Sequence, residues 1–130
     1  MKAADFLDKA ARAAASARLL LNAGDVDGAC NRAYYAMFDA ARAALLASAG
    51  DASEARTHSG LIAAFGLRLV KPGHVRVDLG KALNRVFEIR QAADYTEQAV
   101  SRESADWAVD QADTFVTAMI QLVESSRSRG

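Results

Sequence analysis

The chain has 130 residues, 52% of them hydrophobic, and its 16 basic and 16 acidic side chains cancel to a formal charge of zero. This length suits one domain with a real core, and the charge balance excludes an overall field that attracts nucleic acid, so any such site must be a local patch. No apolar run reaches the ~18–20 residues of a membrane span, no secretory pattern opens the chain, and the lone Cys30 excludes an internal disulfide, so we expect a cytoplasmic location.

Residues 3–22 form the first predicted helix. Alanine is abundant and Pro72 is the one proline in the sequence, which favours helix throughout. Apolar, mostly small side chains recur at three- and four-residue steps on one face, so this helix can pack close to a neighbour. That face consists of Ala3, Phe6, Leu7, Ala10, Ala13, Ala14, Ala17, Leu20 and Leu21. Residues 22–24 predict its end, because Asn and Gly tolerate the left-handed conformation, and Asp25 can cap the next helix.

Residues 26–48 form the second predicted helix, which has two distinct faces. The core face is Cys30, Ala33, Tyr34, Met37, Ala41, Ala44 and Leu45. The other face is polar and carries Arg32, Tyr35, Asp39 and Arg42. Spacing alone favours a solvated surface whose ion pairs contribute only ~0–1 kcal/mol each. The same side chains also suit a groove that faces RNA or a nucleotide, because arginines pair with phosphate and tyrosines stack on bases.

The middle of the chain predicts a loop followed by a short helix. Residues 50–57 are small and polar, as in a loop, whereas residues 58–70 bring apolar side chains to one face. Thr57 or Ser59 is the expected N-cap, and the Lys-Pro-Gly run at 71–73 ends the helix.

Two further long helices complete the chain. Residues 74–77 predict a linker, and Asp78 is the expected cap of a helix that continues to residue 95. A turn at 96–100 separates it from the last helix, residues 101–125, whose apolar face is the most regular of all. Four long helices and one short one, with short connections, predict an all-α fold: an antiparallel four-helix bundle with an extra short helix. We find no internal domain boundary, so the chain is expected to be a single domain.

Arg90 departs most from the pattern of its own helix, because it lies on the apolar face. A guanidinium stays charged and is costly to bury alone, so we expect it to be held by a carboxylate, from Asp94 or Asp39. One interpretation is a structural ion pair. The other is a functional site, in which the Tyr95 hydroxyl lies beside the pair.

Phe38 and Ile89 lie beside the main apolar faces of their helices and have no obvious partner within one bundle. A domain of this size buries limited surface alone. We therefore expect these two side chains to meet a second copy, and the sequence predicts a homodimer.

Four segments taken together resemble the HEPN domain (higher eukaryotes and prokaryotes nucleotide-binding), in its small stand-alone prokaryotic subfamily. They are RAYYAMFDAAR at 32–42, THSGLIAAF at 57–65, LGKAL at 79–83 and NRVFEIRQAADY at 84–95. The similarity runs over about residues 10–123, and RAYYAMF and RQAADY in this order are its most specific part. The resemblance implies that residues 1–130 are a single HEPN-like helical domain that usually dimerises.

The resemblance also implies two kinds of activity. Many members of the family are metal-independent ribonucleases that act through an Arg-x4–6-His motif, and others are partners of a minimal nucleotidyltransferase in toxin–antitoxin pairs. The motif arginine corresponds to Arg90, but Tyr95, Thr96 and Glu97 occupy the positions where the histidine would stand. Asp39 lies where relatives often place a polar residue or a histidine.

Two classes of function are open at this point, and whether the protein is an enzyme is open with them. In the first class it is a nucleotide- or RNA-binding and partner-binding module of a toxin–antitoxin system. The expected binding residues are then Arg32, Tyr35, Arg42 and Arg90. In the second class it is a metal-independent ribonuclease with a degenerate motif. The expected catalytic residues are then Arg90, Asp94, Tyr95 and Asp39.

The first class is favoured because the chain lacks the motif histidine and has no net basic charge. RNA cleavage needs a base with a pKa near neutral, whereas the unshifted pKa is ~10 for a tyrosine and ~4 for an aspartate. A purely structural helical dimer is a third possibility. Arg68 and His74 fit the motif spacing, but they straddle the break at Pro72 and predict no site. One Cys and two distant His offer no zinc-type spacing, so we expect no metal and no cofactor.

Overall fold

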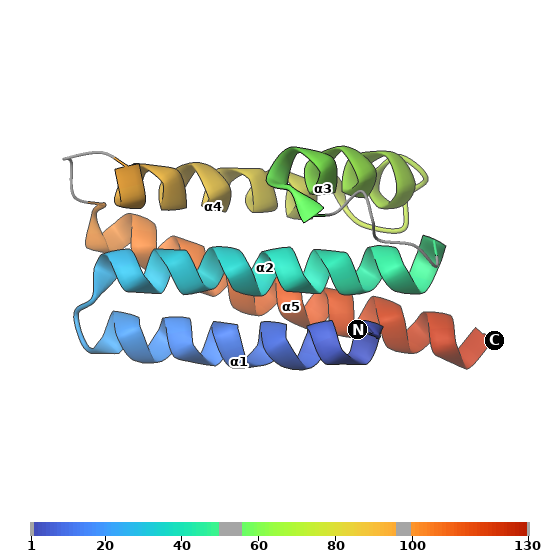
Figure 1. The fold of residues 1–130 in the computed structure, drawn as a ribbon, viewed down its shortest axis with the longest axis horizontal. Coiled ribbons are helices and arrows are strands. Elements are labelled where there is room, and N and C mark those ends of the chain that lie inside the picture. Colours follow the sequence, from blue (N-terminus) through green and yellow to red (C-terminus); the bar gives the residue numbers. More distant parts are fainter. Residues whose placement is uncertain (1, 50–55, 96–99, 130) are drawn as a thin grey trace.

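The computed structural model describes residues 2–49, 56–95 and 100–129. Its helices are α1 (Ala3–Asn22), α2 (Val26–Ala49), α3 (His58–Phe65), α4 (Val77–Tyr95) and α5 (Arg102–Arg129), with a π-helical turn, η2 (Gly66–Val70), after α3. The four long helices alternate in direction along the chain, and α3 lies against α4 (Figure 1). The predicted antiparallel bundle with an extra short helix is confirmed. Within the described ranges, no helix combines the length and apolar character that a membrane crossing needs.

The central helix of the bundle is α2. It contacts α1, α3, α4, α5 and η2, and Figure 1 shows it between α1 on one side and α3 and α4 on the other. Alanine makes this position possible, because a methyl side chain lets neighbouring helices pack closely on several sides of one helix. The buried alanines of α2 are Ala29, Ala33, Ala36, Ala40, Ala41, Ala43 and Ala44.

The helix ends agree with the predicted caps at two places and differ at one. Gly28 N donates to Asp25 Oδ1 (2.9 Å) before α2, and Gly60 N donates to Thr57 Oγ1 (3.0 Å) at the start of α3. The prediction that Asp78 caps α4 is wrong, because α4 already begins at Val77. Asp78 instead accepts two hydrogen bonds from the Arg76 guanidinium, a planar donor that matches a carboxylate.

Two other predicted boundaries change in detail. The helix expected at 58–70 is α3 continued by η2, where Lys71 N donates to Gly66 O (2.8 Å), five residues back. The last helix continues past residue 125, to Arg129. Of the predicted loop and turn, residues 50–55 and 96–99 lie outside the described residues.

The expectation that Phe38 and Ile89 lack a partner within the bundle is wrong. They are 8% and 7% exposed, and both belong to the core cluster. Phe38 packs beside the Tyr34 ring, with a centroid distance of 5.7 Å. Because α2 is surrounded on more than one face, side chains beside its main apolar stripe are covered as well. These two residues therefore give no support to the predicted homodimer, which stays a prediction.

Candidate functional site

A groove runs along α2, bordered by α1 on one side and by α3 and α4 on the other. It encloses about 640 Å³. We call it the Arg90 groove, and its lining residues are Lys9, Arg32, Tyr34, Tyr35, Phe38, Asp39, Arg42, Arg56, His58, Phe87 and Arg90. The fold thus brings together all four predicted binding residues and Asp39, although they come from two helices that are far apart in the sequence.

Arg90 is held on the groove wall by one carboxylate and two aromatic rings. Its Nε donates to Asp94 Oδ2 (3.0 Å), and the two side chains are 17% and 27% exposed. Its Nη2 donates to the Tyr35 hydroxyl (3.4 Å), and its Cζ lies 5.2 Å from the ring centroids of Tyr34 and Tyr35. The expected carboxylate partner is therefore Asp94, which lies one helical turn away on α4. Asn31 from α2 also donates to Asp94 (3.5 Å).

His58 is the site residue that the sequence reasoning missed. It begins α3, its ring stacks on Phe87 with a centroid distance of 3.3 Å, and its Nδ1 shares a hydrogen bond with the Tyr34 hydroxyl (3.2 Å). Burial lowers the pKa of His58, a hydrogen bond with Asn84 opposes this, and the charge of Arg90 lowers it further. Burial also raises the pKa of Tyr34 to about 12. At neutral pH, His58 is thus an uncharged ring fixed beside Tyr34.

Asp39 lies among cations of the groove and not on Arg90. Burial raises the pKa of Asp39, although Lys9, Arg42 and Arg32 all favour its charged form. Removing the carboxylate from water thus outweighs three nearby cations. The alternative that Asp39 pairs with Arg90 is not what the structure shows, since Arg90 pairs with Asp94.

The arginines of the polar face of α2 lie against aromatic rings. Arg42 Cζ is 4.5 Å from the centroid of Phe6, and its buried Nε has no hydrogen-bond partner in the described part of the chain. Arg32 Cζ is 5.7 Å from the centroid of Tyr35. These positions agree with cation–π contacts, which leave the edges of a guanidinium available to another acceptor.

The groove has a local excess of positive charge. Five of its lining residues are cationic, namely Lys9, Arg32, Arg42, Arg56 and Arg90, and Asp39 is the one carboxylate among the described lining residues. Of these cations, Arg90 alone forms an ion pair with a carboxylate in the described ranges. Elsewhere arginines such as Arg18 and Arg76 do so at 2.8 Å or less. The chain therefore contains a local basic patch, although its formal net charge is zero.

The remaining predicted residues lie outside the groove lining. Asp94 acts on it through Arg90, and Tyr95 is the last residue of α4, with a side chain that is outside the described part. Arg68 belongs to η2, and His74 lines a different cavity beside Leu122 of α5. Within residues 2–49, 56–95 and 100–129, no three His, Cys, Asp or Glu side chains cluster as metal ligands.

Comparison with known proteins gives consistent results. Residues 3–123 match the family model described as the HEPN domain. A Thermotoga maritima protein named "UPF0332 protein" is 41% identical over 110 residues, which cover 83% of this chain and 80% of that protein. Two Methanocaldococcus jannaschii proteins also match. The one named "Putative toxin MJ0605" is 34% identical over 65% of this chain and 61% of its own length, and the one named "Putative toxin MJ0142" is 27% identical over 85% and 74%.

Proposed function

The chain belongs to the HEPN domain family, and we propose that it binds a nucleotide or single-stranded RNA in the Arg90 groove. The observation that carries this proposal is the gathering of five cationic side chains around a single carboxylate, in a protein whose formal charge is zero. Phosphate is the ligand group that such a cluster of arginines recognises best, since the planar guanidinium donates two hydrogen bonds at once.

Each side chain of the groove has a distinct role in this proposal. Arg32 and Arg42 lie against aromatic rings, which hold the two guanidinium groups in the groove lining, where they can donate to phosphate oxygens. Tyr35, which is 36% exposed, gives the groove an aromatic side chain that a base can contact. Asp94 fixes the direction of Arg90 and leaves its Nη groups toward the groove. His58, Tyr34 and Phe87 form the wall behind them.

The test compares two arginines of the same helix. Arg90→Gln removes a groove cation, whereas Arg85→Gln removes an exposed cation that pairs with Glu88 outside the groove. Anisotropy of a labelled oligoribonucleotide should show about tenfold or greater loss of affinity for Arg90→Gln, as for one charge-assisted contact, and little change for Arg85→Gln. Circular dichroism checks that both variants are folded. Equal binding by a folded Arg90→Gln and the wild type would overturn the proposal.

Ribonuclease activity is the second candidate, and the position of His58 favours it. The sequence lacks the motif histidine, but α3 supplies a neutral imidazole to the groove that contains Arg90. A neutral imidazole can accept the proton of a 2′-hydroxyl, and an arginine can stabilise the negative charge that develops on the non-bridging phosphate oxygens. Tyr34 and Asn84 both hydrogen-bond this ring, which fits a positioning role better than proton transfer. We therefore place cleavage second.

Incubation with labelled RNA in EDTA distinguishes the two candidates. Under the binding proposal, wild-type protein cleaves slowly or not at all. Cleavage that resists EDTA and is lost in both Arg90→Gln and His58→Gln would make the protein a ribonuclease. Catalytic roles for Asp94, Tyr95 and Asp39 belong to that second candidate and would be tested in the same assay.

We also propose that the protein acts with a partner in a toxin–antitoxin system, because two of its relatives carry the name toxin. The family resemblance suggests a minimal nucleotidyltransferase as that partner. An adjacent reading frame for such a protein, and co-purification of the two products, would support this, and failure to co-purify would contradict it. The homodimer and the cytoplasmic location remain predictions. Light scattering that shows a monomer at micromolar concentration would reject the dimer.

A further inference from the structure

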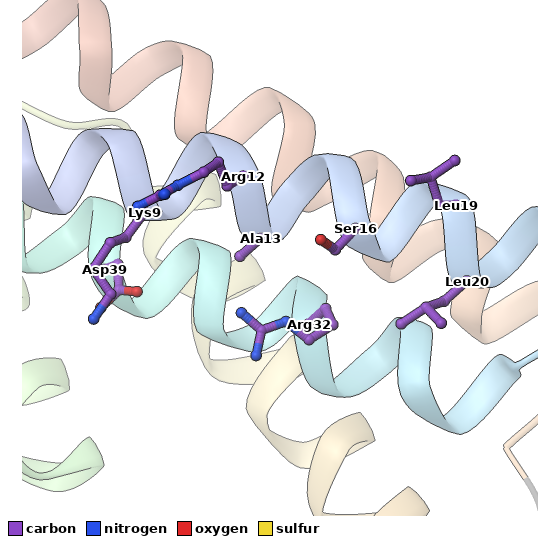
Figure 2. Close-up of a pocket in the computed structure, with 8 residues that line it drawn as sticks. All are labelled: Lys9, Arg12, Ala13, Ser16, Leu19, Leu20, Arg32 and Asp39. Atoms are coloured by element: carbon purple, nitrogen blue, oxygen red, sulfur yellow. The ribbon is translucent and has the colours of Figure 1, made fainter.

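A second hollow continues from the Arg90 groove onto α1. It encloses about 500 Å³ and shares Lys9, Arg32 and Asp39 with the groove. Figure 2 shows Lys9 and Asp39 at one end of this hollow and Leu19 and Leu20 at the other, with Arg32 between them. Because three lining residues are shared, the two hollows adjoin each other, and we call them together the depression.

The second hollow adds residues that the proposed binding site does not use. We call it the α1 arm, and its own lining residues are Arg12, Ala13, Ser16, Leu19 and Leu20. Arg12 is exposed, and in the described ranges it forms no ion pair with a carboxylate. Leu19 is 70% exposed, the largest value among the large hydrophobic residues described. A cation and an uncovered apolar side chain thus lie on one side of a basic depression.

We propose that the α1 arm binds the continuation of a single-stranded polynucleotide whose neighbouring phosphates lie in the Arg90 groove. This inference rests on the proposed function and names its ligand class more narrowly, as a strand of several nucleotides and not a mononucleotide. Arg12, Lys9 and Arg32 line the second hollow, and Lys9 and Arg32 also line the groove, so a strand that crosses from one to the other has cations near its phosphates in both. One mononucleotide would leave most of them unused.

The apolar and aromatic side chains of the depression favour a polynucleotide over an acidic peptide. Leu19 and Leu20 offer an apolar surface to the face of a base, and Tyr35, which is 36% exposed, adds an aromatic side chain in the groove. A string of carboxylates would meet the cations but would leave these apolar and aromatic surfaces uncovered. Cations and apolar or aromatic side chains thus line the same depression, and proteins use this combination to bind single strands without reading their sequence.

The experiment measures how affinity depends on strand length. Fluorescence anisotropy is recorded with a labelled dinucleotide and a labelled octanucleotide of RNA, for wild type, Arg12→Gln and Lys81→Gln. Lys81 is the matched control, because it is an exposed cation of α4 that lines neither hollow. We expect Arg12→Gln to weaken octanucleotide binding about threefold to tenfold and to leave dinucleotide binding unchanged. For octanucleotide binding by Arg12→Gln, the slope of log K against log salt concentration should be about 0.7 smaller in magnitude than for wild type, as for one lost phosphate contact.

The possible outcomes separate this inference from the function on which it rests. If the dinucleotide binds in an Arg90-dependent way and the octanucleotide is equally sensitive to Arg12→Gln and Lys81→Gln, the α1 arm makes no specific contact, and this inference fails while the proposed function stands. If neither RNA binds, the proposed function fails. An octaglutamate peptide tests the other ligand class. If it displaces the octanucleotide at equal concentration, and does so less well from Arg12→Gln, the α1 arm is a docking surface for an acidic protein segment. That result would overturn the inference that the arm binds a polynucleotide.

Discussion

Arginines occur in two settings in this bundle, and the settings differ in what lies next to the positive charge. On the side where α1 meets α5, Arg18 Nη2 donates to Asp110 (2.8 Å) and Asp113 (2.6 Å) and so links the two helices. In the Arg90 groove, Arg32 and Arg42 lie on aromatic rings. Carboxylates neutralise a guanidinium, whereas rings only position it.

This difference separates arginines that stabilise the fold from arginines whose charge remains available. Arg90 combines the two, since it has one carboxylate, Asp94, and two rings, Tyr34 and Tyr35. We infer that the Asp94 carboxylate fixes the direction of the Arg90 guanidinium and that the two tyrosine rings keep it at the groove wall. Variants that change one kind of neighbour at a time separate the contribution of the carboxylate from that of the rings.

The largest effect on stability is expected for Asp94→Asn. The Arg90–Asp94 pair is mostly shielded from water, so the loss of its charge should lower the free energy of unfolding by about 1–3 kcal/mol, between the values for exposed and fully buried pairs. Glu88→Gln, which affects the exposed Arg85 pair on the same helix, should cost less than about 1 kcal/mol. Urea unfolding measures both. Equal effects of the two variants would mean that Arg90 is solvated like Arg85.

A smaller effect, of opposite sign, is expected for Asp39→Asn. Removing the one carboxylate from the described groove lining should raise affinity for a labelled oligoribonucleotide about fivefold, because one repulsion of about 1 kcal/mol disappears. Lower affinity in this variant would show that Asp39 itself contacts the ligand.

The pKa of Asp39 predicts a stability change as well. It is raised above the usual 3.8, so the folded protein keeps this proton to higher pH than the unfolded chain does, and stability falls as pH rises from 3.8 through the folded-state pKa. Asp39→Asn should remove that fall and be more stable than wild type at neutral pH. A variant less stable than wild type at pH 7 would contradict the sign.

His58 predicts a pH dependence in the other direction. Its pKa is lowered in the folded state, so below 6.5 the unfolded chain takes up a proton before the folded protein does. Stability should therefore be complete above 6.5 and decline as pH falls from 6.5 to the folded-state pKa. His58→Gln should lack this decline, whereas His74→Gln, which changes an exposed histidine, should keep it. Unfolding curves at a series of pH values provide the measurement.

The sequence was sufficient for the number and order of the helices and for most contacts within one helix, although the predicted Asp78 cap was wrong and the π-helical turn η2 was not predicted. Periodic apolar faces and caps such as Asp25 and Thr57 act over a few residues, so their outcome can be read locally. The pairing of Arg90 with Asp94 was within reach for the same reason, since the two residues are one turn apart.

The rest of the site depends on contacts between helices, which the spacing of one helix does not contain. His58 and Tyr34 are 24 residues apart, and their contact exists because α3 returns along α2 and α4. Lys9 enters the groove from α1 in the same way. The resemblance covered the segment that contains His58, and a polar ring at the start of an apolar helix was the sign that was available. Phe38 was misjudged because burial in a core shared by several helices cannot be read from the spacing of α2 alone.

The smallest effect, and the most direct test of the two settings, compares Arg42→Met with Arg18→Met. Arg42→Met loses a cation–π contact with Phe6, worth about 0.5–1 kcal/mol, but it also removes a buried Nε without a partner, so stability should change by less than about 0.5 kcal/mol. Arg18→Met loses two exposed ion pairs and should cost about 0–1 kcal/mol at low salt, and less at high salt because of screening. RNA affinity should fall in Arg42→Met alone. A different result would be that Arg42→Met is the less stable variant and that its loss of stability becomes smaller at high salt. The charge of Arg42 would then already be neutralised within the fold, and the distinction between the two settings would not hold for this residue.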